Sequence, residues 1–465
     1  MLDLEGKRIL VLGLGETGLS MVRWLQRRGA SVAVADTRAD PPRARELREL
    51  PGVSLTCGEL HDAGLHGADL IAISPGIDRR TPAVAAAIRR GVPVAGDIEL
   101  FARGLAQLLA RRAPCAAPKM IGITGTNGKS TVTRMAGDIC AAAGLNAKVA
   151  GNIGVPVLEV LTAIEDGAAL PDAFVLELSS FQLESTSSLN ADAATVLNVC
   201  PDHLDRYDSM DAYAAAKARV FNGNGVQVLN RDDARSSAMV LRGRTTCRFG
   251  LDAPPGDREW GVTRRGRRAW LARGGRTLMP LEELPVAGAH NAANALAAGA
   301  LCHAIGIADA PITAALRAFR GLAHRVEKIA EIGGIAFYDD SKGTNVAASV
   351  AALSGFSQPV VLIAGGEGKG QDFSPLRAPL ERHARAVVLI GRDRERLAAA
   401  LEGCHVPLAR AADLEQAVRS AFAACRAGDV VLLSPACASF DMFRDYAHRG
   451  EVFAAAVRAL AGSAP

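Results

Sequence analysis

Long apolar runs, paired cysteines and a large excess of one charge are all missing from this chain of 465 residues. No uninterrupted apolar run approaches the roughly 20 residues that a membrane-spanning helix needs, so we expect no membrane segment and no membrane partner. The N-terminal stretch Met1 to Arg8 is charged and leads directly into a strand, which is unlike a signal peptide. We therefore expect a cytoplasmic protein.

The nine cysteines are scattered, and none forms the C-x-x-C pattern of a zinc cluster. Their spacing gives no disulfide framework either, which fits a reducing compartment. The net charge is only +4, so no basic field indicates nucleic acid, and we expect no nucleic-acid partner. The Arg-rich stretch 264–268 is interpreted as a solvated hairpin, within an insertion at 254–285 whose alternating apolar positions predict antiparallel strands.

The chain does contain enough apolar residues for several cores, 49% against 22% charged. Its length exceeds one ordinary core, and we expect three domains. Strands and helices alternate, which predicts the α/β class. A linker-like segment at Pro114–Pro118 and a change of pattern near Gly321 divide the chain into residues 1–113, 114–321 and 322–465.

The first domain is predicted to be Rossmann-like. Residues 7–14 indicate a buried parallel strand, and a G-x-G-x-x-G motif at 13–18 opens an apolar-periodic helix. A second strand, Ser31–Ala35, ends at Asp36, which completes a βαβ unit with a dinucleotide-type fingerprint and an acid. On these residues alone, a nicotinamide-dependent oxidoreductase is one alternative.

The most informative stretch is Ile121–Thr131, which predicts a strand end, a glycine-rich turn and the first turn of a helix. Backbone N–H groups at such a turn surround a phosphate, Lys129 adds positive charge, and Ser130 offers a hydroxyl to Mg²⁺. The general P-loop pattern would place glycine at position 123, where this chain has Ile123. We still predict a central P-loop mononucleotide-binding α/β domain, and a non-catalytic nucleotide switch is a second alternative.

Two polar loops of this domain follow predicted strands, where α/β sheets bind their ligands. Glu177 is placed to hold Mg²⁺ beside the phosphate loop, with a helix cap or an ion pair as the alternative interpretation. His203 stands in a crowd of polar and ionisable groups, which favours a site over a structural histidine. Lys217 lies on a helix and, on composition alone, is a solvated surface lysine.

The third domain is predicted to be a C-terminal Rossmann-like α/β domain. Its expected strands are Ile335–Asp340, Val360–Ala364, Ala386–Ile390 and Asp429–Ser434. Polar loops at 339–345, 365–370 and 433–441 follow three of these strands. They should line one face of the domain, where a second substrate would bind.

Seven blocks stand in order along the chain: Gly125–Thr131, Glu177–Gln182, Asp202–Tyr207, His290–Asn294, His324-Arg325, Asp340–Lys342 and Ser434–Asp441. Together they resemble the Mur ligase family, and the resemblance covers the full chain. The short first domain with Asp36-Thr37-Arg38 is similar to that of the members that add D-glutamate to UDP-N-acetylmuramoyl-L-alanine.

The resemblance implies an ATP-dependent amide ligase with two Mg²⁺ ions. Its implied catalytic residues are Lys129, Glu177, His203 and Lys217. Ser130 would bind one Mg²⁺, Glu177 would bind a Mg²⁺ between the γ-phosphate and the acyl substrate, and His203 would bind the second Mg²⁺. Lys217 matches the family's carbamylated lysine, whose anionic oxygens suit Mg²⁺, so the resemblance overrides the surface interpretation. The implied ATP-binding set is Gly125, Thr126, Asn127, Gly128, Lys129, Ser130, Thr131, Asn291, Asn294, Arg325 and Asp340.

In this family the first domain holds the uridine diphosphate of the substrate instead of a nicotinamide cofactor. The implied UDP-substrate positions are Glu16, Thr17, Asp36, Thr37, Ser74, Gly76 and Asn152. The implied D-glutamate positions are Lys342, Thr344, Lys369, Ser439, Phe440 and Tyr446. Tyr446 stands where the compared family member has phenylalanine, and a buried tyrosine hydroxyl needs a partner.

The implied reaction uses ATP to turn the L-alanyl carboxylate into an acyl phosphate, which the amine of D-glutamate attacks. A folylpolyglutamate-type ligase, or another Mur-type ligase with a different amino acid, is the remaining alternative. The folylpolyglutamate type lacks a separate N-terminal UDP-binding domain, which residues 1–110 resemble. We expect a monomer.

Overall fold

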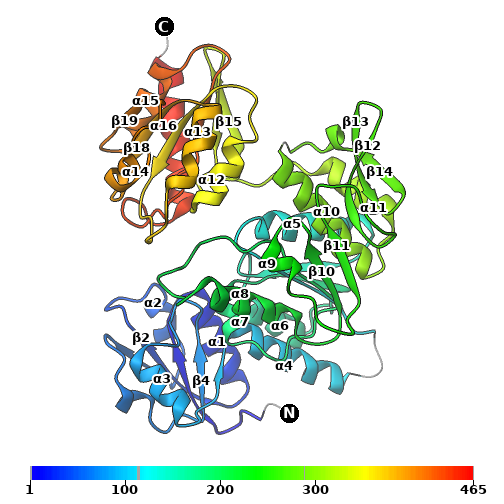
Figure 1. The fold of residues 1–465 in the computed structure, drawn as a ribbon. Coiled ribbons are helices and arrows are strands. Elements are labelled where there is room, and N and C mark those ends of the chain that lie inside the picture. Colours follow the sequence, from blue (N-terminus) through cyan, green and yellow to red (C-terminus); the bar gives the residue numbers. More distant parts are fainter. Residues whose placement is uncertain (1–2, 113–115, 287, 464–465) are drawn as a thin grey trace. The chain divides into compact units, whose positions relative to one another are not determined.

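The computed structural model describes residues 3–112, 116–286 and 288–463, and it contains three α/β domains, each built on its own sheet (Figure 1). Contacts divide the chain into two compact units. The first comprises Met1–Val199, Asp211–Met279 and Ala295–Leu316, and the second comprises Cys200–Met210, Pro280–Asn294 and Arg317–Pro465.

The N-terminal sheet has five parallel strands in the order β3-β2-β1-β4-β5. The strands are β1 (Arg8–Leu12), β2 (Ser31–Asp36), β3 (Ser54–Cys57), β4 (Leu70–Ile73) and β5 (Val94–Ala95). The helices are α1 (Glu16–Arg27), α2 (Ala44–Arg48), α3 (Pro82–Arg89) and α4 (Asp97–Arg111). Leu10 and Leu12 of β1 pack with Ile71 and Ile73 of β4 and with Val84 of α3 in one core cluster. This Rossmann-like order brings the ends of β1, β2 and β4 together at one edge.

The middle sheet has nine strands in the order β14-β13-β12-β11-β10-β9-β6-β8-β7. The strands are β6 (Lys119–Thr124), β7 (Ala147–Gly151), β8 (Ala173–Glu177), β9 (Ala193–Val196), β10 (Val226–Asn230), β11 (Thr246–Phe249), β12 (Trp260–Arg265), β13 (Arg268–Arg273) and β14 (Arg276–Pro280). The helices are α5 (Lys129–Ala142), α6 (Val157–Glu165), α7 (Ser180–Glu184), α8 (Met210–Ala218), α9 (Ala234–Ser237), α10 (Ala289–Ala304) and α11 (Asp309–Ala318). The strand β6, which leads to the phosphate loop, lies between β8 and β9 and is parallel to both.

The N-terminal and middle domains pack against each other within the first unit. Phe101 of α4 meets Phe174 of β8 edge to face, with ring centroids 5.2 Å apart. A Cβ at Gly104 would come within 2.7 Å of Trp24 in α1 and 2.8 Å of Leu161 in α6. Only glycine therefore allows α4 to approach α1 and α6 this closely. Arg28 of α1 forms an ion pair with Glu165 of α6.

The C-terminal sheet has six strands in the order β15-β16-β20-β17-β18-β19, and only β15 pairs antiparallel. The strands are β15 (Glu327–Ile332), β16 (Ile335–Asp339), β17 (Val360–Gly365), β18 (Ala384–Ile390), β19 (Leu408–Arg410) and β20 (Val430–Leu433). The helices are α12 (Val346–Leu353), α13 (Arg377–His383), α14 (Arg394–Ala400), α15 (Leu414–Ala424) and α16 (Tyr446–Ser463). Short 3₁₀ helices lie at Asp62–Leu65, Arg219–Phe221, Leu281–Glu283 and Ser374–Leu376.

Both faces of the C-terminal sheet are covered. Val360 and Leu362 belong to the core cluster of α12, α13 and α14, whereas Val361 and Ile363 belong to that of α15 and α16. Successive side chains of a strand point to opposite faces, so the continuous apolar run of β17 is what a sheet between two helix layers requires. Figure 1 shows α15 and α16 on one side of this sheet and α12 and α13 on the other.

The predicted α/β class with three domains is confirmed, and so are the predicted central strands and the antiparallel strands in 254–285. The first two residues of the predicted linker Pro114–Pro118 lie outside the described residues. Among the described residues, no helix is both long enough and apolar enough to cross a membrane.

Candidate active site

The phosphate loop runs from the end of β6 into the first turn of α5. Gly125 and Gly128 both have positive φ, +155° and +85°, and Gly128 is the N-terminal cap of α5. A Cβ at Gly125 would lie only 2.9 Å from the Leu197 Cβ, so this close turn needs glycine. Ile123 lies fully buried within β6. The loop therefore begins two residues later than the general pattern would have it, which explains why no glycine is needed at position 123.

Asn198, two residues after the end of β9, stabilises the turn of the phosphate loop by hydrogen bonds. The Thr126 N–H donates to the Asn198 carbonyl (2.9 Å), and the Asn127 N–H donates to Asn198 Oδ1 (2.8 Å). The Asn198 amide donates in return to the Asn127 carbonyl (3.1 Å). Helix α5 then starts at Lys129, so its N-terminal N–H groups and positive dipole end adjoin the turn, an arrangement suited to binding phosphate.

Two lysines converge on the carbonyl side of the loop. Lys129 Nζ donates to the carbonyls of Gly125 (2.9 Å) and Thr126 (2.8 Å). Lys217 Nζ donates to the same Gly125 carbonyl (2.8 Å) and lies 4.4 Å from the centroid of the Tyr213 ring. Lys217 is only 1% exposed, so its interpretation as a surface lysine from composition was wrong. Lys217 is therefore a buried amine that contacts the phosphate loop.

Glu177 ends β8, directly beside the phosphate loop strand. It is the parallel neighbour of Ile123, and it is 1% exposed. Its Oε1 accepts a hydrogen bond from the Asn152 side-chain amide (2.8 Å), whereas its buried Oε2 has no hydrogen-bond partner among the described residues. The cap of the following helix is Ser179, so Glu177 has no capping role.

The unpartnered Oε2 is a direct test of whether this site suits a cation. A buried carboxylate oxygen without a partner is costly, and a hard cation such as Mg²⁺ prefers oxygen ligands of this kind. The Ser130 hydroxyl lies in the first turn of α5 and is 3% exposed. Glu177 and Ser130 therefore fit a Mg²⁺ site beside the phosphate loop.

The glycine motif of the N-terminal domain forms a tight turn between β1 and α1. A Cβ at Gly18 would lie 1.9 Å from the Gly13 carbonyl oxygen, so the helix can approach the turn only because residue 18 is glycine. The Ser74 hydroxyl, at the end of β4, donates to that same carbonyl (3.0 Å). Glu16 starts α1 and forms an ion pair with Arg43.

Asp36 ends β2 and is 1% exposed. Its Oδ1 accepts from the backbone N–H and the Nε of Arg38, both at 2.9 Å, and its Oδ2 accepts from the Leu14 N–H and Arg38 Nη2, both at 2.6 Å. Burial alone would raise its pKa, but the hydrogen bonds from Arg38 and Leu14 hold the pKa below the usual value. A carboxylate has about four acceptor positions, and all of them are used here.

In the second unit, the three polar loops after β16, β17 and β20 lie side by side, as predicted. The Gly365 N–H donates to the Pro435 carbonyl (2.8 Å), and the Ala436 N–H donates to the Gly343 carbonyl (3.0 Å). Glu367 and Ala438 exchange two backbone hydrogen bonds of 3.0 and 2.9 Å. This edge therefore carries most of the predicted amino-acid site.

The implied D-glutamate residues lie in these three loops, except Tyr446, which is the first residue of α16. Lys342 Nζ lies 4.7 Å from the centroid of the Tyr446 ring. Ser439 is buried, whereas Phe440 is 67% exposed, the most exposed large apolar side chain among the described residues. Lys369 has a positive φ of 47°, a strained backbone position for a residue with a side chain.

The implied nucleotide residues of the second unit cluster around Arg325 and Asp340. Burial raises the pKa of Asp340 to about 7, even though the Ser434 hydroxyl donates to its Oδ2 (2.7 Å) and Arg325 lies nearby. His324 Nδ1 lies 2.6 Å from Asp339 Oδ2. Asn291 and Asn294 are one turn apart on α10 and are joined by a 3.3 Å hydrogen bond. Burial, with a contribution from Arg325, lowers the pKa of His290.

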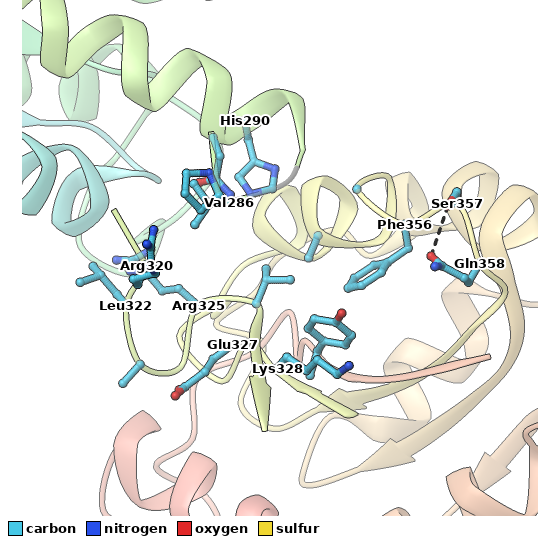
Figure 2. Close-up of a pocket in the computed structure, with 18 residues that line it drawn as sticks. Val286, His290, Arg320, Leu322, Arg325, Glu327, Lys328, Phe356, Ser357 and Gln358 are labelled. Carbon is cyan, nitrogen blue, oxygen red and sulfur yellow. Dashed lines mark hydrogen bonds between the residues drawn. The ribbon is translucent and has the colours of Figure 1, made fainter. Parts of the chain in front are cut away.

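A cavity of about 700 Å³ adjoins these residues (Figure 2). Its lining includes His290, Asn291 and Arg325. Tyr338 and Phe356, which also line it, meet edge to face with centroids 4.9 Å apart. The cavity therefore offers both polar and aromatic surface beside part of the implied nucleotide set.

His203 also belongs to the second unit. It has a left-handed backbone (φ 55°), and its N–H donates to Asp202 Oδ1 (2.9 Å). Asp202 Oδ2 accepts from the Asn345 amide (3.3 Å), and Asn345 caps α12. The structure thus gathers the implied metal residues Ser130, Glu177 and Lys217 in one unit and describes His203 in the other.

Sequence reasoning missed Arg449 of α16. Its side chain is 1% exposed and donates hydrogen bonds to Ser341 and Cys437. No spacing in the sequence separates this arginine from a surface arginine, because its burial depends on loops that are more than a hundred residues away in the case of Ser341.

Three domain families match the chain in order. They are "Mur ligase MurD-like, N-terminal domain" at residues 7–96, "Mur ligase middle domain" at 123–302 and "Mur ligase, glutamate ligase domain" at 324–437. The chain therefore belongs to the Mur ligase family, as its motifs predicted.

Two relatives within the family are more than half identical to this chain. The UDP-N-acetylmuramoylalanine--D-glutamate ligase of Thiobacillus denitrificans is 57% identical over 470 residues, which cover 99% of this chain and 98% of the relative. The ligase of the same name from Nitrosospira multiformis is 55% identical over 462 residues, which cover 99% of this chain and 97% of the relative.

Solved structures show the same fold at low identity. The alanine ligase MurC of Thermotoga maritima matches with a TM-score of 0.59 and 19% identity, over 98% of this chain and 100% of that one. A folylpolyglutamate synthase of Mycobacterium tuberculosis, complexed with ADP, matches with a TM-score of 0.56 and 18% identity, over 82% of this chain and 98% of that one.

Proposed function

We propose that this protein is an ATP-dependent ligase that joins D-glutamate to UDP-N-acetylmuramoyl-L-alanine in the synthesis of peptidoglycan precursors. The names of relatives that are 55% and 57% identical over 99% of the chain support this substrate pair. The structural observation that carries the chemistry is the buried Oε2 of Glu177 beside the Gly125–Thr131 loop, which has no hydrogen-bond partner in the described part of the chain. We place the enzyme in the cytoplasm as a monomer.

The three domains divide the substrates among them in this proposal. Residues 1–113 bind the UDP part of the substrate, residues 114–321 bind ATP, and residues 322–465 bind the amino acid. The tight turn at Gly13–Gly18, the phosphate loop and the three joined loops of the C-terminal sheet support these roles.

The residues that we propose to bind ATP come from both units of the chain. The loop residues are Gly125, Thr126, Asn127, Gly128, Lys129, Ser130 and Thr131, and the others are Asn291, Asn294, Arg325 and Asp340. Glu177, Ser130 and His203 are the proposed Mg²⁺ ligands. Bound Mg²⁺ supplies positive charge that neutralises the phosphoryl oxygens during transfer.

Lys217 is proposed to carry a carbamate. The Lys217 ammonium first loses a proton to give the amine, and the amine nitrogen then bonds to the carbon of CO₂ and loses a second proton. The cation is thereby converted into an anionic oxygen ligand. The burial of Lys217 and its hydrogen bond to the Gly125 carbonyl support the placement, because a carbamate there would lie beside the phosphate loop.

The proposed reaction has two transfers. An oxygen of the L-alanyl carboxylate attacks the γ-phosphorus of ATP, and ADP leaves. The D-glutamate nitrogen then attacks the acyl carbon and loses a proton, and phosphate leaves as the amide forms. Lys129 stabilises the charge on the phosphoryl oxygens, and the remaining residues chiefly hold the reacting groups in line.

The substrate residues are those that the family resemblance implies. The UDP-substrate set is Glu16, Thr17, Asp36, Thr37, Ser74, Gly76 and Asn152, and the D-glutamate set is Lys342, Thr344, Lys369, Ser439, Phe440 and Tyr446. The hydrogen bond from Asn152 to Glu177 would link the end of the UDP-substrate to the activation site.

Phosphate release tests the proposal directly. Purified protein is given ATP, Mg²⁺ and UDP-N-acetylmuramoyl-L-alanine, with D-glutamate, L-glutamate, L-lysine or diaminopimelate in turn. Phosphate release with D-glutamate alone is the expected result. Turnover with another amino acid would overturn the acceptor, and no turnover with any would overturn the ligase. Glu177→Gln is the matched control, because it keeps the shape and removes the charge.

A further inference from the structure

Arg449, in the first turn of α16, is a fully buried cation that the proposed reaction does not use. Its Nε donates to the Ser341 hydroxyl (2.9 Å), its Nη2 to the Ser341 carbonyl (2.7 Å) and its Nη1 to the Cys437 carbonyl (3.1 Å). All three acceptors are uncharged, and no ion pair between Arg449 and a carboxylate is found among the described residues. Burial lowers its pKa to about 10, so it stays charged at neutral pH.

The two residues that Arg449 binds lie on two of the three loops of the proposed amino-acid site, those after β16 and β20. Ser341 directly precedes Lys342 in the loop after β16, and Cys437 lies two residues before Ser439 in the loop after β20. One planar guanidinium therefore spans both loops and fixes the distance between them. A planar fork of several N–H donors suits this task in a way that a single ammonium does not.

Further contacts hold the first turn of α16 close to the same loops and to the end of β16. The Ser341 hydroxyl donates to the Tyr446 carbonyl (2.7 Å), and the Tyr446 ring lies under Lys342. A Cβ at Gly450 would come within 2.2 Å of His324 Nδ1 and 2.5 Å of Asp339 Oδ2. The first turn of α16 therefore cannot shift without moving the loops that it touches.

The charge of Arg449 is partly compensated by neighbouring carboxylates. Burial lowers its pKa, whereas Asp441, Asp339 and Asp340 act to raise it, so these acids lie close enough to stabilise the buried cation. The hydrogen bonds that Arg449 makes to the two loops, and not an excess of positive charge, therefore carry its role.

We propose that Arg449 is a positioning residue for the amino-acid acceptor: it acts through Ser341 and Cys437 to hold Lys342 and Ser439 where they receive the carboxylates of D-glutamate. This inference rests on the proposed function, and it goes beyond it because none of the residues that the family resemblance implies is Arg449. Arg449 itself does not touch the substrate.

The test compares the full-length wild type with Arg449→Lys and Arg449→Met in steady-state phosphate release. Lysine keeps the charge but cannot span both loops. We expect its KM for D-glutamate to rise about tenfold, while the KM values for ATP and the UDP-substrate stay within about twofold. Methionine also loses the charge, and we expect a larger rise in the same KM.

A second readout separates positioning from general structural damage. Hydroxylamine traps an acyl phosphate as a hydroxamate without D-glutamate, so trapping should proceed at the wild-type rate in Arg449→Lys. Ser341→Ala removes one acceptor and leaves the arginine in place. It guards against a variant that fails to fold, and we expect a smaller rise in the KM for D-glutamate.

An unchanged KM for D-glutamate in folded Arg449→Lys would overturn the inference. So would an equal loss in all three KM values together with slower hydroxamate formation. If both arginine variants fail to fold, an unchanged KM for D-glutamate in Ser341→Ala overturns it instead. If the wild type accepts a different amino acid, the proposed function fails, and the same comparison with that amino acid still decides the role of Arg449.

Discussion

Lys217 shows how burial changes the meaning of a single residue. Its amine is enclosed beside the phosphate loop, where an ammonium would repel Mg²⁺ and a carbamate would bind it. We predict that Lys217→Ala loses activity by roughly 100-fold or more. Loss of a residue that only supports a metal ligand typically costs about 10- to 100-fold, and this substitution would remove a ligand itself. Added formate or acetate should restore part of the activity by entering the vacated space, as steady-state phosphate release would show.

The matched control is Lys217→Arg, which keeps the positive charge and cannot form a carbamate. We expect it to be inactive and insensitive to short carboxylates, because no space is vacated. Full activity of either variant would show that no carbamate is needed at this position.

Asp36 illustrates a residue whose own bonding limits its role. Its acceptor positions are taken by Arg38 and Leu14, so we expect Asp36 to serve the UDP-substrate through Arg38 instead of by direct contact. We predict that Asp36→Asn raises the KM for the UDP-substrate about tenfold with little change in kcat, because the amide cannot hold the Arg38 guanidinium. Calorimetric titration with UDP measures the same loss without turnover.

Arg38→Ala is the comparison that identifies the contact. If Asp36 acts through Arg38, the two variants have similar affinities for UDP and the double variant is no worse than either. Additive losses would mean that Asp36 touches the nucleotide itself. The same bonding pattern argues against a nicotinamide cofactor. An acid at this position would have to accept hydrogen bonds from the ribose hydroxyls of that cofactor.

At the scale of elements, helix α4 joins the N-terminal domain to the segment after Glu177 through two acids of opposite behaviour. Gln182 donates to Asp97 (2.9 Å), whose burial raises its pKa to about 6. Because its folded-state pKa is raised, the contribution of Asp97 to folding stability is most favourable below the ordinary pKa of 3.8 and is lost as the pH rises through 6. We predict that Asp97→Asn stabilises the protein by up to about 3 kcal/mol at pH 7.5 but little at pH 4, as measured by urea unfolding.

Glu99, two residues along α4, is the control with the opposite sign. Although burial acts to raise its pKa, hydrogen bonds from Ser187 and Ser188 lower it to about 2. A depressed folded-state pKa gives stability above the ordinary pKa of 4.5 that is lost as the pH falls toward 2. Glu99→Gln should therefore destabilise at pH 7.5 and less so at acidic pH. A matching pH trend in both variants would contradict the assignment.

Which elements could be predicted from sequence depends on burial. Central strands such as β4 and β17 are covered on both faces, so each is a continuous apolar run that is easy to recognise. The strands β3, β7, β15 and β19 lie at the sheet edges, are partly exposed and carry mixed residues, and they were not predicted.

The site divides in the same way. The phosphate loop and Glu177 were predictable, because the chemistry stands in consecutive residues after a strand. The burial of Lys217 depends on tertiary contacts, and only the family resemblance pointed to a role for it. Arg449 had no local signal, because its partners lie on loops that the sheet topology brings to it.

At the scale of the whole molecule, the second unit is formed by three segments of chain, but the described core clusters of its sheet come from one of them. Both core clusters around the C-terminal sheet lie within residues 326–460. The segments Cys200–Met210 and Pro280–Asn294 add polar contacts, such as the hydrogen bond from Asn345 to Asp202, and cavity lining, but no residue of these clusters.

We therefore predict that a polypeptide of residues 322–465 folds alone, with one cooperative thermal transition in far-ultraviolet circular dichroism, because a complete core is enclosed on both faces of its sheet. The control begins at residue 346 and lacks β15 and β16. It loses Ile335 and Phe337 from the core and leaves the β20 edge, Val430–Leu433, unpaired, so it should show no cooperative transition. An unfolded 322–465 polypeptide would mean that the domain boundary lies elsewhere, and that the 200–210 and 280–294 segments supply stability that their polar contacts alone do not suggest.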